Sequence, residues 1–251
     1  MDKVTAILQA RMSSRRLPGK VLMEVLGRPL LAYEIERLQR CSSLRDIVLA
    51  TSDQPQDEPV ATLGKQLGVK VFRGSEDDVL DRYYWAAKDC DAEHVMRVTG
   101  DCPLIEPGIC ELAVDTYFKM NADYLCTSPR FAEGLDCEII SMSALETAWK
   151  EAAAPSEREH VTLFVRNRPD RHAMVELDND SDDSAYRVTV DDPEDFEVVK
   201  AVMKALIPAH GSSFGWQHTK TFLDTHPNIM AMNAEIVRNE GLAVSLAKEA
   251  K

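Results

Sequence analysis

The segment QARMSSRRLPGK, residues 9–20, concentrates positive charge in a chain whose formal net charge is -13. Its four cationic side chains belong to Arg11, Arg15, Arg16 and Lys20. Like charges a few ångströms apart repel by roughly a few tenths to about 1 kcal/mol per pair even in water, so a free loop gains nothing from this crowding. An anionic ligand bound among these side chains would turn this net repulsion into a net attraction. The segment is therefore a candidate anion-binding loop, and the alternative is a basic surface loop that pairs with acidic side chains elsewhere.

The same segment contains the groups that bind a polyphosphate. The hydroxyls of Ser13 and Ser14 and the backbone amides of residues 10–14 can donate hydrogen bonds. Arginine binds phosphate oxygens as a planar fork, whereas lysine acts as a point charge. Gly19 is the only glycine, so the segment is neither a P-loop nor a G-x-G-x-x-G dinucleotide motif. We expect it to neutralise a triphosphate.

Two aspartates follow strand-like segments farther along the chain. Asp101 comes directly after Gly100 in RVTGDCPLI. A carboxylate there suits Mg²⁺, which takes one or two carboxylates together with phosphate and water oxygens, and the alternative is an aspartate that caps a turn. Asp191 ends AYRVTVD, before Asp192, which suffices as a helix N-cap. Asp191 is thus free to point into a ligand crevice, unless both aspartates merely stabilise the helix dipole.

Short β-rich runs alternate with helical patterns in the first half of the chain. Helices are predicted to begin at Pro29, at Ser75 with Asp78 three residues later, and at Pro107. This alternation indicates an α/β fold with a largely parallel sheet, helices on both faces and ligands bound beyond the carboxyl ends of the strands. The predicted strands are residues 4–10, 46–51, 69–72, 94–99 and 122–127.

The pattern loosens over residues 128–185, which we interpret as an inserted lobe or dimerisation arm of a single domain spanning residues 1–251. This segment is predicted to contain a helix over residues 143–153, a second helix that begins at Ser156, and a strand-like stretch around residues 171–177. A further strand-like stretch is predicted around residues 185–190.

The β-α pattern then returns. A helix is predicted from Pro193, capped by Asp192, to about Leu206. Residues 216–251 are predicted to form a C-terminal helical tail, with two short helices around residues 219–225 and 228–238.

Composition excludes several functional classes. The 42 acidic residues against 29 Lys plus Arg argue against nucleic-acid binding, which needs a net positive surface. We expect no membrane span and no signal peptide, because no apolar run is long enough and Met1-Asp2-Lys3 leads directly into VTAILQA. The six cysteines form no C-x-x-C pair, which indicates neither a zinc site nor a disulfide framework. A cytoplasmic protein is the simplest interpretation.

Three motifs, LQARMSSRRLPGKVL, VTGDCPLI and VDDPEDFEVV, resemble those of the CMP-KDO and CMP-sialic acid synthetase superfamily of cytidylyltransferases. The resemblance is closest to its spore-coat polysaccharide cytidylyltransferase-like branch, and FLDTHPNIMAMNAEIVRNEGLAVSL extends it into the tail. It implies a Rossmann-like, GT-A-type mixed sheet. It also implies a reaction that joins the CMP moiety of CTP to a sugar or sugar acid and releases pyrophosphate, for surface polysaccharide or glycoconjugate synthesis.

The resemblance assigns roles around CTP. Asp101 and Asp191 would both hold Mg²⁺, and Lys20 and the loop arginines would stabilise the departing pyrophosphate; the implied catalytic residues are Arg11, Lys20, Asp101 and Asp191. The base would lie near Leu8 and Ala10, with Arg73 and Arg97 as candidate readers unless they are surface salt-bridge arginines. The implied nucleotide-binding residues are Leu8, Ala10, Arg11, Ser13, Ser14, Arg15, Lys20, Arg73 and Arg97.

The acceptor candidates lie in the looser segment. Asp136 and Glu138 alternate in GLDCEII, so both project from one face of a strand. They would bind acceptor hydroxyls or assist the metal, unless that face is simply solvated. His160 would contact the acceptor or act as a base, although a surface histidine is the commoner outcome. Arg130 and Arg158 are the expected partners of an acceptor carboxylate. The segment also resembles the arm that dimerises relatives, which implies a homodimer.

Two other functions remain open. A GT-A glycosyltransferase would bind an already activated nucleotide-sugar, but such enzymes display a D-x-D metal motif, whereas Asp101 is followed by Cys102 and Pro103. A catalytically silent nucleotide-binding module is the non-enzymatic alternative. The intact set of Lys20, Asp101 and Asp191 favours an active nucleotidyltransferase.

Overall fold

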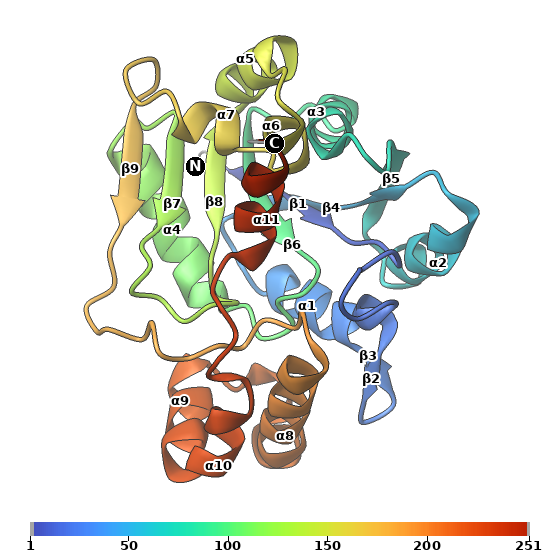
Figure 1. Ribbon diagram of the computed structural model, residues 1–251, viewed down its shortest axis with the longest axis vertical. Coiled ribbons are helices and arrows are strands. Elements are labelled where there is room, and N and C mark those ends of the chain that lie inside the picture. The colour runs from blue at the N-terminus through green and yellow to red at the C-terminus, as the bar shows by residue number, and fades with distance from the viewer. Residues whose placement is uncertain (1–2, 250–251) are drawn as a thin grey trace.

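A seven-stranded sheet forms the centre of the molecule in this computed structural model, which describes residues 3–249 (Figure 1). The strand order is β5-β4-β1-β6-β8-β7-β9. Only β8 runs antiparallel to its neighbours β6 and β7, so the predicted mixed, mostly parallel sheet is confirmed. The strands are β1 (Val4–Gln9), β4 (Leu44–Ser52), β5 (Lys70–Gly74), β6 (His94–Thr99), β7 (Tyr124–Thr127), β8 (Glu138–Ser141) and β9 (Met174–Leu177).

Helices cover both faces of this sheet because the central strands are apolar on both sides. In β1, Ala6 and Leu8 face one helical layer, whereas Ile7 faces the other. The first layer contains α1 (Leu30–Gln39), α2 (Glu58–Gln66) and α4 (Pro107–Lys119). The second contains α3 (Val79–Asp89), α5 (Met142–Glu151) and α7 (Leu163–Arg166).

Residues 128–185 contribute to this same sheet. They supply β8 and β9 as well as α5, α6 (Pro155–Glu159) and α7, and whether they also form a dimer contact stays a prediction. The expected strand around residues 185–190 is wrong, because Val188 and Val190 donate their amides to the loop carbonyls of Glu133 and Asp101, at 2.8 Å each. Only an isolated bridge pairs Arg187 with Glu133.

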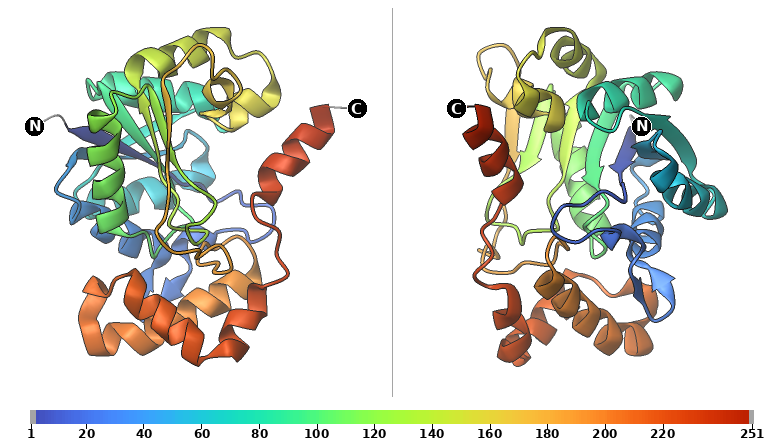
Figure 2. Two further views of the ribbon diagram at one scale, coloured as in Figure 1. Left: turned by 90° about the vertical axis from the view of Figure 1, so that its left-hand side faces the viewer. Right: turned by 45° about the vertical axis from the view of Figure 1, so that its right-hand side comes forward.

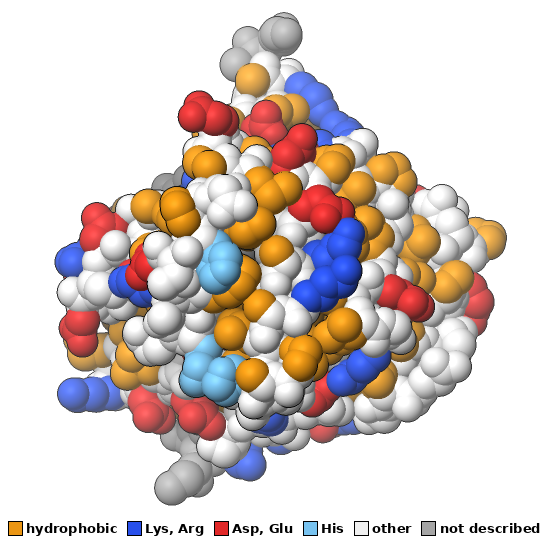
Figure 3. All heavy atoms as spheres, turned by 90° about the horizontal axis from the view of Figure 1, so that it is seen from below, with side chains coloured by type: hydrophobic (Ala, Val, Ile, Leu, Met, Phe, Trp, Pro, Cys, Tyr) orange, Lys and Arg blue, Asp and Glu red, His pale blue; other side chains and the backbone are white. Residues whose placement is uncertain are grey.

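The C-terminal part forms a separate helical layer below the sheet (Figures 1 and 2). It comprises α8 (Pro193–His210), the 3-10 turn η3 (Gly211–Ser213), α9 (Trp216–Thr225), α10 (Pro227–Met230) and the 3-10 turn η4 (Ala231–Asn233). It shares a hydrophobic cluster with the hairpin of β2 (Glu24–Val25) and β3 (Arg28–Pro29). Seen from below, apolar, histidine and charged side chains are interspersed over this layer (Figure 3).

The chain then leaves this layer and ends in α11 (Glu240–Glu249), which returns toward α6 (Figures 1 and 2). The helix expected over residues 228–238 is therefore wrong in its bounds, and α11 lies outside it. Two further 3-10 turns, η1 (Lys20–Leu22) and η2 (Pro55–Asp57), flank the end of β1. None of the helices within residues 3–249 is long and apolar enough to cross a membrane.

Candidate active site

The cationic loop follows β1 and lies at the carboxyl ends of the parallel strands. The Ala10 amide donates to the carbonyl of Ala50 in β4 at 3.2 Å, and the Asp57 carboxylate accepts the Met12 amide at 2.6 Å. Gly19 has a φ of 72°, a left-handed conformation that glycine adopts readily, and it donates its amide to the Met12 carbonyl at 2.9 Å. This folds the loop back so that the next residue, Lys20, enters the protein.

Lys20 lies between the two predicted metal-binding aspartates. Its Nζ is 3.1 Å from Asp101 Oδ2 and 2.7 Å from Asp191 Oδ1. Burial would lower the pKa of Lys20, but the two carboxylates outweigh it and raise the pKa above its ordinary value. Burial likewise opposes ionisation of Asp101, yet Lys20 and hydrogen bonds from Thr99 and Cys102 lower the pKa of that carboxyl to about 2. Lys20 and Asp101 are therefore both charged at neutral pH.

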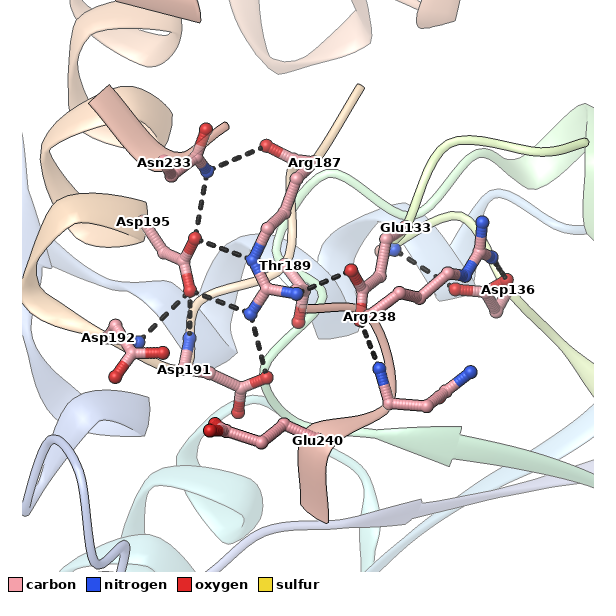
Figure 4. A network of polar contacts seen from close by, with 12 residues as sticks. Glu133, Asp136, Arg187, Thr189, Asp191, Asp192, Asp195, Asn233, Arg238 and Glu240 are labelled. Atoms are coloured by element: carbon pink, nitrogen blue, oxygen red, sulfur yellow. Dashed lines mark hydrogen bonds and ion pairs between the residues drawn. The ribbon is translucent and has the colours of Figure 1, made fainter. Parts of the chain in front are cut away.

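Asp191 is held in place by a buried network that the sequence analysis missed (Figure 4). Arg187 contacts Asp191 Oδ2 at 3.2 Å and binds Asp195 through Nε and Nη2 at 2.8 and 2.9 Å. Asp195 is fully buried and also accepts the backbone amides of Asp191 and Asp192 and the Asn233 side chain. A side chain from the C-terminal layer thus helps to fix the catalytic candidate at the end of the sheet.

Arg16 closes the same cluster from the solvent side. Its guanidinium lies 3.1 Å from Asp191, 3.0 Å from Asp192 and 2.6 Å from Glu240 at the start of α11. Three cationic side chains, those of Lys20, Arg16 and Arg187, therefore surround the Asp191 carboxylate. In this arrangement the protein's own carboxylates form ion pairs with the cationic side chains that would otherwise bind an anionic ligand.

Two pockets meet at this cluster. The first, which we name the loop pocket, has a volume of about 320 Å³ and is lined by the cationic loop. The second, the strand pocket, has about 350 Å³ and lies over β6, β8, β7 and β9. Both pockets share one wall, formed by Arg16, Thr99, Asp101, Asp191, Glu240 and Gly241. This wall is where a group bound in one pocket reaches a group bound in the other.

Most predicted nucleotide-binding residues line the loop pocket: Ala10, Arg11, Ser13, Ser14, Arg15 and Lys20. Leu8 does not, because its side chain is fully buried in the core. Arg73 does not either, because Glu58 and the carbonyls of Ser52 and Gln54 hold its guanidinium. Arg97 lies in the strand pocket, paired with Glu138.

Arg82, which sequence analysis missed, also lines the loop pocket. Its side chain is buried, and its Nε is without a hydrogen-bond partner among the described residues.

The predicted acceptor-binding residues also fall into some that line a pocket and some that do not. Asp136, Glu138 and His160 line the strand pocket. Arg130 and Arg158 line neither pocket: Arg130 is exposed and pairs with Asp178, and Arg158 binds Asp78 and the Trp149 carbonyl. Burial lowers the pKa of His160, which favours its neutral form.

The Lys20 ammonium, which contacts both Asp101 and Asp191, indicates how a metal ion would fit. Within residues 3–249 no group of three or more His, Cys, Asp or Glu side chains could hold a metal ion on its own. Two carboxylates that converge on one cation suit Mg²⁺, because this ion completes its octahedron with phosphate and water oxygens. The Lys20 ammonium is the stand-in cation at this position.

The C-terminal segment walls both pockets, which no sequence motif predicted. Residues 237–242 line the strand pocket, whereas residues 240, 241, 244 and 245 line the loop pocket. None of the residues of α11 is buried, and polar side chains connect it to α6. Ser245 Oγ lies 2.8 Å from Glu159 and 3.2 Å from His160, and Glu249 accepts the Ser156 hydroxyl at 2.8 Å.

Comparison with known sequences gives consistent results. Residues 5–211 match the family model described as cytidylyltransferase. The spore coat polysaccharide biosynthesis protein SpsF of Bacillus subtilis is 32% identical over 211 residues, which cover 80% of this chain and 87% of that protein.

Solved structures point the same way. A cytidylyltransferase from Leptospira borgpetersenii is 33% identical and superposes with a TM-score of 0.87, over 95% of this chain and 100% of that one. A CMP:2-keto-3-deoxy-manno-octonic acid synthetase in complex with CTP has a TM-score of 0.61 at 18% identity, over 81% of this chain and 99% of that chain. The second likeness shows a common fold and confirms the predicted GT-A-type class.

Proposed function

Because this chain belongs to the cytidylyltransferase family, we propose that it joins the CMP moiety of CTP to a hydroxyl group of a sugar or sugar acid and releases pyrophosphate. The observation that carries the proposal is that Asp101 and Asp191 lie at the wall common to the two pockets, and that Lys20, which lines the loop pocket, contacts both carboxylates. CTP would occupy the loop pocket and the acceptor the strand pocket. The α-phosphorus would then lie at the common wall.

The loop supplies the electrostatics for this transfer. The acceptor oxygen forms a bond to the α-phosphorus while the bond from that phosphorus to the pyrophosphate oxygen breaks, and the acceptor hydroxyl passes its proton to water. Charge builds up on the departing pyrophosphate, so cations positioned in advance lower the barrier. Arg11, Arg15, Arg16 and Lys20 all line the loop pocket and would bind these oxygens. Arg15 is exposed and forms no ion pair with the described residues, so it is available without rearrangement.

Asp101 and Asp191 would hold Mg²⁺, which neutralises phosphate charge and aligns the triphosphate when bound. With the metal bound, the Lys20 ammonium would be released from these carboxylates and would bind a phosphate oxygen in the loop pocket. The Arg187–Asp195 pair would keep Asp191 oriented in both states.

The acceptor class follows from the relatives and the pocket. SpsF takes its name from spore coat polysaccharide biosynthesis, which supports an acceptor destined for a surface polysaccharide or glycoconjugate. The carboxylates of Asp136 and Glu138 in the strand pocket suit a polyhydroxylated ligand. A homodimer and a cytoplasmic location stay predictions.

A pyrophosphate-release assay tests the proposal. The protein is incubated with each of the four nucleoside triphosphates, Mg²⁺ and a panel of sugar acids, sugar phosphates and neutral sugars. We expect release only with CTP and one acceptor class. In a parallel reaction with nucleotide-sugars in place of the triphosphates, release of a nucleoside diphosphate would instead identify a glycosyltransferase. Nucleotide binding with no turnover on any acceptor would favour a silent module.

A further inference from the structure

The strand pocket is rich in charge, and nearly all of that charge is neutralised within the protein. Among its lining arginines, Arg97 pairs with Glu138 at 2.6 Å, Arg187 with Asp195 at 2.8 Å, and Arg16 with Glu240 at 2.6 Å. Arg238 pairs with Asp136 and donates to the carbonyls of Pro129 and Phe131 at 2.8 Å each (Figure 4 draws its pairing with Asp136). None of these four guanidinium groups is free to bind a ligand without breaking an ion pair.

Arg166 is the exception. It lines the strand pocket and is exposed, and its side chain forms no hydrogen bond or ion pair within residues 3–249. The backbone of Arg166 is nevertheless held in place. This residue ends α7, and the preceding residues Leu163, Phe164 and Val165 are buried against the sheet. An exposed guanidinium that has no ion pair within residues 3–249 is therefore attached to an anchored part of the backbone.

The positive charge of Arg166 faces the floor of the pocket. Burial opposes ionisation of Glu138, but Arg97, the Tyr124 hydroxyl and Arg166 outweigh it and lower the pKa of that carboxyl. Arg166 also acts on Cys126, where it opposes the rise in thiol pKa that burial causes. Both residues belong to strands that form this floor.

Strand register defines that floor. Arg97 of β6 pairs with Glu138 of β8, Glu138 with Cys126 of β7, and Cys126 with Glu176 of β9. Neighbouring strands lie about 4.8 Å apart, so this row leads stepwise away from β6, the strand that precedes Asp101. Glu176 of β9 lies at the far end of this row, and the common wall lies beyond the carboxyl end of β6.

We propose that Arg166 binds an anionic group of the acceptor, a carboxylate or a phosphate, and so selects charged sugars over neutral ones. This inference rests on the proposed function, because it assumes that the acceptor occupies the strand pocket. Carboxylates still outnumber arginines along this pocket, and their excess negative charge would repel an anionic sugar. A free arginine offsets that repulsion, and its fork matches the two oxygens of a carboxylate or phosphate.

Geometry also explains why Arg166 takes the role expected of Arg130 and Arg158. Both of those side chains are paired within the protein and line neither pocket. A neutral sugar would leave the Arg166 charge without a partner once the ligand displaces water from the pocket, which disfavours binding.

The test compares Arg166→Ala with Arg171→Ala, a matched control in which the lost arginine is exposed, pairs with Glu151 and lies outside both pockets. Steady-state rates are measured with sugar acids, with sugar phosphates and with the neutral counterpart of each. We expect Arg166→Ala to raise the KM for the charged acceptor by about 10- to 100-fold, as loss of a charge-assisted hydrogen bond does. The melting temperature and the calorimetric Kd for CTP should not change. The control should behave as the unmodified protein.

Calorimetry with each acceptor alone separates this inference from the proposed function. Binding of a sugar acid or a sugar phosphate that is lost in Arg166→Ala supports the inference, even if pyrophosphate is never released, and it identifies which anion is recognised. A neutral sugar as the preferred acceptor, or equal losses for charged and neutral sugars in Arg166→Ala, would overturn it. So would failure of the unmodified protein to bind any anionic sugar.

Discussion

At the scale of single residues, the molecule balances its charges around one lysine. Lys20 neutralises Asp101 and Asp191, and Arg16 and Arg187 neutralise the remaining charge on Asp191. A bound metal–triphosphate complex would supply both kinds of charge from outside, with the metal for the carboxylates and the phosphates for the cations. The cluster is thus complementary to the ligand even while it is internally paired.

Removing one of these charges should impair chemistry more than folding. We expect Asp101→Asn to lower pyrophosphate release by about 100-fold or more, because a group positioned at the reacting centre typically contributes that much. The fold should persist, since Lys20 keeps Asp191 as a partner. Turnover and thermal melting are measured beside Asp115→Asn, an exposed change on α4. A near-normal rate in Asp101→Asn would remove this residue from the site.

The depressed pKa of Asp101 also predicts how stability depends on pH. Its carboxyl titrates at about 2 in the folded protein against 3.8 ordinarily, so the folded state binds fewer protons between these values. Its contribution is complete above about pH 4 and is lost as the pH falls toward about 2. Urea unfolding across this window should show a shallower loss of stability in Asp101→Asn than in the unmodified protein. Parallel curves for the two proteins would contradict the assignment.

At the scale of elements, the start of α8 is the structural support of the site. Asp195 accepts two backbone amides ahead of this helix, binds Arg187 and contacts Asn233 from the C-terminal layer. One buried carboxylate therefore connects the sheet end, the helix and the tail.

Loss of that carboxylate should destabilise the fold. We expect Asp195→Ala to reduce the free energy of unfolding by about 3–5 kcal/mol, because it leaves the buried Arg187 without its main partner. Glu197→Ala, on the same helix but exposed and paired only with Lys200, should change stability by less than about 0.5 kcal/mol. Equal losses in urea titrations of the two variants would show that Asp195 has no special supporting role.

The contact of α11 with the loop competes with the nucleotide. Glu240 occupies Arg16 at 2.6 Å, and a triphosphate would need this guanidinium. We expect Glu240→Gln to tighten CTP binding by about two- to fivefold, the range set by a solvent-exposed ion pair. Calorimetry at fixed Mg²⁺ measures the change, with the exposed Glu235→Gln as control. Unchanged or weaker CTP binding in Glu240→Gln would mean that Glu240 and the triphosphate do not compete for Arg16.

At the scale of the whole molecule, the sequence predicts what depends on local pattern. The five predicted strands are all present, and the cationic loop and Asp101 lie at strand ends as expected, because apolar runs and turn residues determine these features locally. Lys20 and Asp101 lie close together because β1 and β6 are parallel neighbours whose carboxyl ends meet at one edge of the sheet. Asp191 follows no strand, and the hydrogen bond from the Val190 amide to the Asp101 carbonyl brings it to the same place.

The rest of the site could not be predicted, because it depends on which partner each charged side chain finds in three dimensions. Arg158 and Arg166 lie in the same short region of the sequence, yet Asp78 binds the first whereas the side chain of the second lines the strand pocket without an ion pair to any residue of 3–249. Glu240 comes from the opposite end of the chain and meets Arg16 only because the tail crosses both pockets. No periodicity or motif contains that information.

A crystal structure of the protein with CTP and Mg²⁺ tests the account most directly, because it locates the reacting phosphorus. We expect the triphosphate along residues 10–20 in the loop pocket, the metal between Asp101 and Asp191, and the α-phosphate at the wall common to both pockets. CTP bound elsewhere, or an α-phosphate turned away from the strand pocket, would contradict the proposed transfer.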